Sequence, residues 1–248
     1  MGLTKSIDIN CDMGESYGNY HIGNDTALMP YINSANIACG MHGGDPVHIE
    51  RTICLALEHN VRIGAHPGYP DLQGFGRRVI AMKPEELASF IKYQVAALKG
   101  LVEANGGKLA YVKPHGALYN HIAQNKADAQ VVIQAIRSID SSLSIMGLAG
   151  SHMKTLVEEA GSTFIAEAFA DRRYEIDGKL RSRSLPDALI TNPKDACEQV
   201  LSIANALFTQ TLAGDKVSLV ADSFCIHGDN PAALAIAKSL NEQIKGNS

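Results

Sequence analysis

The fold is decided by residues 35–65, which read ANIACGMHGGDPVHIERTICLALEHNVRIGA. The stretch begins with a short apolar run at 35–39 and ends with a second one at 61–65. Between them a helix is expected over 45–59, because Asp45 is a good N-cap and the proline that follows it suits the first helical position. Strand, helix and strand in this order predict a parallel βαβ unit.

The same pattern recurs along the chain. Seven apolar runs of four to six residues are each bounded by polar or glycine-rich residues, which is typical of strands covered on both faces. They lie at 6–10, 35–39, 61–65, 109–112, 144–148, 163–168 and 217–221. Helices are expected between them, over 45–59, 83–105, 127–136, 152–160 and 195–211, and from 229 to about 244.

Seven such units in 248 residues predict a seven-stranded TIM-like (β/α) barrel, with residues 1–248 as a single domain. A doubly wound open sheet is the alternative. No linker, low-complexity tract or charge block divides the chain. Residues 171–193 lack clear periodicity, and the Asp177-Gly178 pair predicts a hairpin turn between 173–176 and 179–182. We expect this segment to be a long loop on the barrel rim.

The composition narrows the class of function. Hydrophobic residues make up 46% of the chain, and 22 Lys and Arg against 26 Asp and Glu give a net charge of −4. A chain with this net charge lacks the excess positive charge that binds nucleic acid or the surface of an anionic membrane. A signal-peptide core and a membrane span of roughly 18 apolar residues are both missing, so a cytoplasmic location is expected. Five cysteines without a Cys-x-x-Cys pair favour free thiols.

Polar side chains gather just after the expected strands. Parallel α/β folds bind ligands at the carboxyl ends of their strands, because the βα loops meet there. The side chains that we single out in these positions are Asn10, Asp12, Glu15, His42, Asp45, His66, Arg77, Lys113, His115, Glu167, Asp171, Arg172, His227 and Asp229. We therefore expect one functional site on this rim.

Histidines are the strongest signal in these loops. A single histidine after a strand is usually a structural hydrogen-bonding residue, but His42, His66, His115 and His227 all occupy this topological position, beside Gly, Pro or a carboxylate. The other five histidines are expected to face solvent or to pack. The sequence matches neither of two common nucleotide-binding motifs. Residues 147–150 are too short for the dinucleotide-binding glycine pattern, and residues 150–155 lack the spacing of a phosphate-binding loop. If ATP is used, this chain holds it in another way or leaves it to a partner.

Seven short segments carry a family resemblance. They are DINCDMGE (8–15), NIACGMHGGDP (36–46), GAHPGYPD (64–71), GFGRR (74–78), VKPHGALYN (112–120), EAFADRRY (167–174) and CIHGD (225–229). In this order and spacing they resemble the LamB/YcsF family, from about residue 6 to residue 244. The departures, such as Met13, Met41 and Gly43, change no ionisable position.

The resemblance implies the A subunit of a prokaryotic 5-oxoprolinase. Together with two partner subunits, B and C, it would convert 5-oxo-L-proline, ATP and water into L-glutamate, ADP and phosphate. The resemblance also implies a seven-stranded β/α barrel similar to polysaccharide deacetylases and some glycoside hydrolases, which agrees with the strand count. Two alternatives stay open: a stand-alone metal-dependent amidohydrolase or deacetylase, and a non-catalytic subunit.

Opening an unstrained lactam requires an activated carbonyl, a positioned water and a proton for the nitrogen. Catalysis is assigned as a hypothesis to Asp12, Glu15, His42, His66, His115 and Asp229. Substrate binding is assigned to Asn10, Asp45, Arg77, Lys113, Glu167, Asp171, Arg172 and His227, since Arg and Lys bind carboxylate or phosphoryl oxygens. By similarity to deacetylase barrels, Asp12, His42 and His66 also form a candidate set of ligands for a divalent metal.

Overall fold

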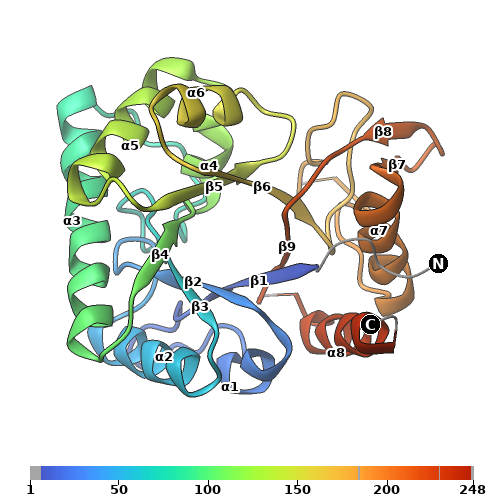
Figure 1. Cartoon of the computed structure of the whole chain (residues 1–248), viewed down its shortest axis with the longest axis horizontal. Coiled ribbons are helices and arrows are strands. Elements are labelled where there is room, and N and C mark those ends of the chain that lie inside the picture. Colours follow the sequence, from blue (N-terminus) through green and yellow to red (C-terminus); the bar gives the residue numbers. More distant parts are fainter. Residues whose placement is uncertain (1–6, 184, 229, 247–248) are drawn as a thin grey trace.

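The computed structural model describes residues 7–183, 185–228 and 230–246. Parallel strands form a closed barrel in the order β1-β2-β3-β4-β5-β6-β9, and β9 pairs with both β1 and β6 (Figure 1). The strands are β1 (Asp8–Met13), β2 (Ser34–Ala38), β3 (Arg62–His66), β4 (Leu109–Val112), β5 (Ser144–Leu148), β6 (Phe164–Phe169) and β9 (Ser223–Ile226). The predicted seven-stranded barrel is confirmed, and closure excludes the open sheet.

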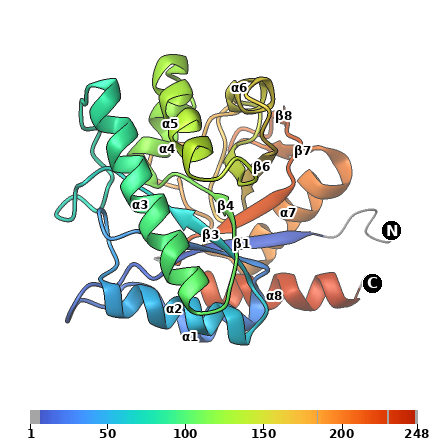
Figure 2. The same ribbon diagram turned by 60° about the vertical axis from the view of Figure 1, so that its left-hand side comes forward.

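Helices cover the outside of the barrel. The longer ones are α2 (Pro46–Glu58), α3 (Pro84–Ala104), α5 (Lys126–Ile139), α7 (Pro193–Ala206) and α8 (Ala233–Gly246). The shorter ones are α1 (Asp25–Leu28), a 3₁₀ turn at Met29–Tyr31, α4 (Gly116–Ile122) and α6 (Met153–Glu159). Figure 2 shows α3 and α5 side by side on one flank, while α7 packs against α8 on the other side of the barrel.

Local sequence explains where the helices begin and which face they bury. Asp45 caps α2 by accepting hydrogen bonds from the backbone N–H groups of Val47 and His48, as expected for an N-cap aspartate. Helix α3 buries an apolar stripe with a spacing of three or four residues against the barrel, formed by Leu87, Ile91, Val95, Leu98 and Val102. That stripe is the pattern of an amphipathic helix packed on a sheet.

The seventh barrel strand lies further along the chain than predicted. Val217 belongs to β8 (Lys216–Ser218), which pairs antiparallel with β7 (Phe208–Gln210) outside the barrel. In β8 only Val217 is buried, whereas every residue of β9 is buried. A strand covered on both faces must be apolar or internally bonded throughout, so β9 takes the barrel position. Helix α7 accordingly ends at Ala206, five residues earlier than the predicted limit of 211.

Buried side chains fill the barrel interior. The Tyr111 hydroxyl donates to Asn36 Oδ1 at 2.6 Å, and Asn36 Nδ2 donates to Asn10 Oδ1 and Asp12 Oδ1 at 2.8 Å each. Tyr111 is fully buried and lies against Gly64 of β3, where an added Cβ would be 2.2 Å from its ring. Glycine at 64 therefore makes room for the tyrosine that fills the barrel.

The rim segment 171–193 contains the predicted turn. Tyr174 and Leu180 form an antiparallel bridge, and the Glu175 N–H donates to the Lys179 carbonyl around Asp177-Gly178. The five cysteines are free thiols, as expected. Among residues 7–183, 185–228 and 230–246, no helix is long and apolar enough to cross a membrane.

Candidate active site

A cavity of about 880 Å³ lies at the carboxyl ends of the barrel strands. The strand ends and the loops that follow them place seven of the predicted site residues on its wall: Asp12, His66, Arg77, Lys113, His115, Arg172 and His227. Loops after β4, β5 and β6 and the β8 region complete the wall. The cavity therefore occupies the position where parallel barrels hold their active sites.

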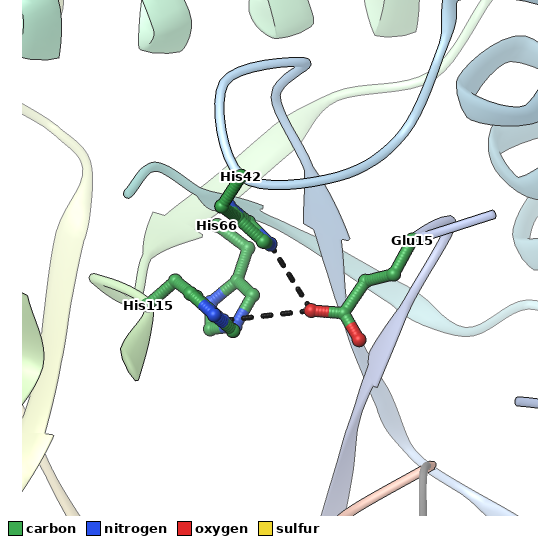
Figure 3. A group of neighbouring side chains, drawn as sticks. All are labelled: Glu15, His42, His66 and His115. Carbon is green, nitrogen blue, oxygen red and sulfur yellow. Dashed lines mark hydrogen bonds and ion pairs between the residues drawn. The ribbon is translucent and has the colours of Figure 1, made fainter. Parts of the chain in front are cut away.

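Three histidines and a glutamate meet beside this cavity (Figure 3). His42 Nε2 lies 3.0 Å from Glu15 Oε1, and His115 Nδ1 lies 3.5 Å from the same oxygen. His115 Nδ1 is also 3.0 Å from His66 Nε2, and the rings of His42 and His115 stack with centroids 3.6 Å apart. All four side chains are buried. Below, we call these four residues the histidine cluster.

Backbone carbonyls determine which nitrogens of two of these rings carry protons. His66 Nδ1 lies 2.7 Å from the Lys113 carbonyl, and His115 Nε2 lies 2.8 Å from the Phe75 carbonyl. A carbonyl oxygen only accepts hydrogen bonds, so both of these nitrogens are donors. In the neutral rings, the lone pairs of His66 Nε2 and His115 Nδ1 then face each other across 3.0 Å. Such a pair is stable only with a cation between the two nitrogens, either a shared proton or a metal ion.

Burial favours the neutral form of two rings in the cluster. The pKa of His115 is held well below its usual value, first by burial and then by the nearby His42 and His66. Burial, followed by the field of His66, likewise lowers the pKa of His42. Neutral imidazoles are the form that ligates metals.

The donor atoms of the histidine cluster fit a divalent metal. The four ligand atoms lie within 4.8 Å of one another, and the contacts just given separate neighbouring donors by 3.0 to 3.5 Å. Ligands about 2.0–2.1 Å from a tetrahedral zinc ion are roughly 3.3 Å apart, so little movement is needed. Of the predicted metal set, the structure groups His42 and His66 here with Glu15 and His115. Asp12 lies at the edge of the cluster, with Oδ2 3.3 Å from His66 Nε2.

Lys113 forms a second centre on the cavity wall. Its Nζ lies 2.9 Å from Asp12 Oδ1, 2.7 Å from Glu167 Oε1, 3.3 Å from Asn10 Oδ1 and 3.2 Å from Cys225 Sγ. Burial opposes the charge on Lys113, but the negative groups around it outweigh burial and raise the pKa of its amine. Burial also opposes the charge on Asp12, but His66 and Lys113 outweigh it and lower the pKa of that carboxyl. The centre is therefore a charged lysine held between two carboxylates.

Asp171 and His227 form a carboxylate–histidine pair, and the His227 side chain lines the cavity. Asp171 Oδ1 lies 2.8 Å from His227 Nδ1, while Asp171 Oδ2 accepts from the His227 backbone N–H at 3.1 Å and from Asn230 Nδ2 at 3.0 Å. Burial acts against the charge on Asp171, but these partners, His227 foremost, lower its pKa. The His227 ring also stacks on Phe169, with the ring planes 16° apart.

Two further predicted site residues, Asp45 and Arg172, belong neither to the histidine cluster nor to the group around Lys113. Asp45 caps α2, accepts from the Gly18 N–H at 2.7 Å, and does not line the cavity. Asp229 lies outside the described residues. Arg172 is buried on the cavity wall and donates through Nη2 to the Arg181 carbonyl. Burial, together with the neighbouring Arg183, lowers the pKa of the Arg172 guanidinium to about 10.

Sequence reasoning missed several parts of the site. Asn36 and Tyr111 join the polar network inside the barrel, and Cys225 contacts Lys113. One signal could have found Asn36: it is an amide inside a fully buried strand, in register with Asp12 on the neighbouring strand. The Phe75 carbonyl that fixes His115 could not be found from residue types, because every residue has a carbonyl.

Comparisons with known proteins match this architecture over nearly the whole chain. The LamB/YcsF family model matches residues 7–248. The A subunit of 5-oxoprolinase from Bordetella parapertussis is 46% identical over 245 residues, covering 99% of this chain and 97% of the relative. That of Shouchella clausii is 49% identical over 241 residues, covering 97% of this chain and 95% of the relative.

A solved structure is also similar. The crystal structure of a lactam utilization protein from Thermus thermophilus superposes with a TM-score of 0.92 at 38% identity, covering 98% of this chain and 97% of the other. The family model, the relatives and the solved structure all match nearly the whole length of the chain. The chain belongs to the LamB/YcsF family.

Proposed function

We propose that this protein is the A subunit of an ATP-dependent 5-oxoprolinase, which opens the lactam of 5-oxo-L-proline to L-glutamate together with subunits B and C. The observation that carries the proposal is the full-length similarity, at 46–49% identity, to proteins named as the A subunit of 5-oxoprolinase. The cavity chemistry supports it, because charged, proton-carrying and anion-binding groups line one wall.

Ring opening adds water across the amide C–N bond. The carbonyl carbon gains a hydroxyl group, and the nitrogen gains a proton and leaves as an amine. Amide resonance opposes attack, so we propose that ATP activates the carbonyl by phosphorylation of the amide oxygen. Departure of the amine then leaves an acyl phosphate, and a second water molecule hydrolyses it to L-glutamate and phosphate. The protein's part is then to bind anionic groups, to stabilise charge on the reacting oxygens, and to move protons.

Cationic side chains of the cavity suit the anionic substrate. We assign Lys113 to stabilising negative charge on the reacting oxygens, since its amine is buried, charged and rigidly held by Asp12 and Glu167. Arg172 is assigned to the substrate carboxylate or to phosphoryl oxygens, since its Nε has no hydrogen-bond partner among the described residues. A buried guanidinium nitrogen left unpaired favours an incoming anion. Arg77 on the same wall is the second candidate for this role.

A divalent metal is part of the proposal, with Glu15, His42, His66 and His115 as its ligands. When bound, such a metal polarises a carbonyl oxygen or lowers the pKa of a water molecule. The residues of the chain contribute the rest: the Lys113 and Phe75 carbonyls orient two ligand rings, and Gly76, where a Cβ would lie 2.7 Å from His115, leaves space for them.

ATP and the partner subunits complete the proposal. The relatives are named as one component of a larger enzyme, and the sequence has no phosphate-loop fingerprint. We therefore place ATP in the assembled complex as a co-substrate. The cytoplasmic location stays a prediction from the sequence.

Reconstitution of the complex tests this function. Subunits B and C, each shown to be folded, are mixed with ATP and 5-oxo-L-proline, with and without this chain, and both glutamate and ADP are measured. We expect glutamate to form only when this chain is present. Absence of 5-oxoproline-dependent ATP turnover from the complete mixture would overturn the proposal.

A stand-alone metal-dependent amidohydrolase is a second candidate, and the histidine cluster is the observation that favours it. This function predicts amide hydrolysis by the isolated chain without ATP, and loss of that activity together with bound metal in His66→Ala. Activity that strictly requires ATP and the partners would exclude it.

A further inference from the structure

Among the four histidines on the rim, His227 alone offers the cavity a ring nitrogen with no protein partner in the described part of the chain. The contacts given above engage both nitrogens of His66 and of His115. His42 uses Nε2 for Glu15, and its Nδ1 is sealed inside the protein, where an added Cβ at Gly68 would be 2.9 Å away. His227 uses Nδ1 for Asp171, and its side chain is 12% exposed on the cavity wall.

Asp171 fixes the tautomer of this ring. An ionised carboxylate only accepts hydrogen bonds, so His227 Nδ1 carries the proton and Nε2 carries the lone pair. Asp171 itself is fully buried, and its two carboxylate oxygens have three donors: the ring and the backbone N–H of His227, and the Asn230 amide. The acid is therefore held as a carboxylate and cannot turn away from the imidazole.

Two further contacts hold the ring itself. Phe169 stacks on it with the ring centroids 5.4 Å apart. A His227 ring nitrogen also lies within 4.8 Å of a ligand atom of Asp12 and of Cys225 Sγ. Asp12 and Cys225 both contact the Lys113 amine. The imidazole thus lies next to the lysine centre to which the proposed reaction assigns the developing negative charge.

We propose that His227 is the proton-transfer residue of the reaction and that Asp171 is its positioning residue. His227 Nε2 takes a proton from the attacking water as the water oxygen bonds to the lactam carbonyl carbon. It then gives that proton to the lactam nitrogen as the C–N bond breaks. The imidazole ends in its starting state, so no other acid or base is consumed. A histidine oriented by a carboxylate is a common general base and acid. This inference rests on the proposed function.

The test compares His227→Gln and Asp171→Asn with the wild type in the complex with subunits B and C. Positioned general base catalysis contributes about 10²–10⁴-fold, so we expect His227→Gln to lower kcat by at least about 100-fold. KM for 5-oxo-L-proline should stay within a few-fold, and the acidic limb of the pH–rate profile should disappear. Asp171→Asn should lower kcat and shift the same limb, because the amide supports the wrong tautomer.

Controls separate this role from a structural one. His59 is exposed at the end of α2, and His59→Gln should leave both kcat and the pH profile unchanged. His227→Asn is the second variant, used if His227→Gln lowers the melting temperature. Imidazole added to His227→Ala should restore part of the rate. A kcat for folded His227→Gln or His227→Asn near the wild-type value, with the acidic limb intact, would overturn the inference.

A readout without substrate keeps the inference separate from the proposed function. Nitrogen-15 NMR of the isolated chain should show His227 protonated at Nδ1 and unprotonated at Nε2, and Asp171→Asn should lose this single tautomer. If the wild-type complex fails to turn over 5-oxo-L-proline, the proposed function fails while the tautomer can still be present. A His227 ring protonated at Nε2 would contradict the assigned role whatever the substrate is.

Discussion

His66 Nε2 and His115 Nδ1 lie 3.0 Å apart, and each ring donates the proton of its other nitrogen to a backbone carbonyl. The fold thus holds two lone pairs towards each other inside the protein, beside the Glu15 carboxylate and the ring of His42. Repulsion between them is relieved only by a cation, and a divalent metal also satisfies the other two donors.

Zinc should bind the isolated, chelator-treated chain at one site in the histidine cluster. Replacing the ligand in His115→Ala should weaken binding by roughly 100-fold or more, since outer-shell partners alone are worth about 10–100-fold. Isothermal titration calorimetry measures this directly, and His59→Ala, on the exposed end of α2, is the control. Equal zinc affinity in wild type and His115→Ala would show that the cluster is not the site.

Replacing the buried Lys113 should lower the free energy of unfolding of the protein. Lys113→Met leaves Asp12 and Glu167 close together without their shared partner, and breaking a buried ion pair costs about 3–5 kcal/mol. Urea denaturation at pH 7 measures the loss. Glu167→Gln in the Lys113→Met background should recover part of it, because one uncompensated charge is removed. A loss below about 1 kcal/mol in Lys113→Met would contradict this account.

Two glycine-to-alanine substitutions should change the stability of the protein in opposite directions. Gly64→Ala places a Cβ 2.2 Å from the Tyr111 ring, so overpacking should destabilise the barrel by about 1–3 kcal/mol. Gly100 lies within α3 with nothing within 4 Å of an added Cβ, so Gly100→Ala should stabilise by about 0.4–1 kcal/mol. Thermal unfolding of both variants measures the difference. Equal melting temperatures would contradict the assigned packing of Tyr111.

The Asp171 carboxylate should make stability depend on pH in acid. Its pKa is lowered in the folded protein, so its contribution is complete above the unfolded pKa of about 3.9. The contribution is lost as pH falls through the lower, folded pKa. The difference in the free energy of unfolding between wild type and Asp171→Asn, measured with urea, should therefore shrink as the pH falls below about 4. A difference that grows as the pH falls below about 4 would have the wrong sign.

Much of the fold follows from the sequence because strands covered on both faces leave a local trace. Six of the seven barrel strands were predicted close to their positions, since short apolar runs alternate with capped helices such as the one begun by Asp45. The seventh was wrong because residues 217–221 and 223–226 are both apolar. Only the closure of the barrel between β1 and β6 decides between them. That residues 1–248 form a single domain stays a prediction.

The site was predictable in its location but not in its contacts. Parallel topology brings the residues after each strand to one rim, so His66 and Lys113 could be placed there from their positions after predicted strands. The partners of each side chain depend on distances between loops that are far apart in the chain. Sequence reasoning therefore grouped Asp12 with His42 and His66, whereas Glu15 and His115 complete the cluster. Asp45 was given two roles: the structure confirms the helix cap, and the residue does not line the cavity where substrate binding was expected.

The most direct test of the account is the glutamate formed from 5-oxo-L-proline and ATP by subunits B and C with this chain or its His227→Gln variant. We expect steady glutamate production with the wild-type chain, about 100-fold or more slower production with the variant, and none when the chain is left out. Glutamate production at the same rate with and without the chain would show that the chain takes no part in the reaction.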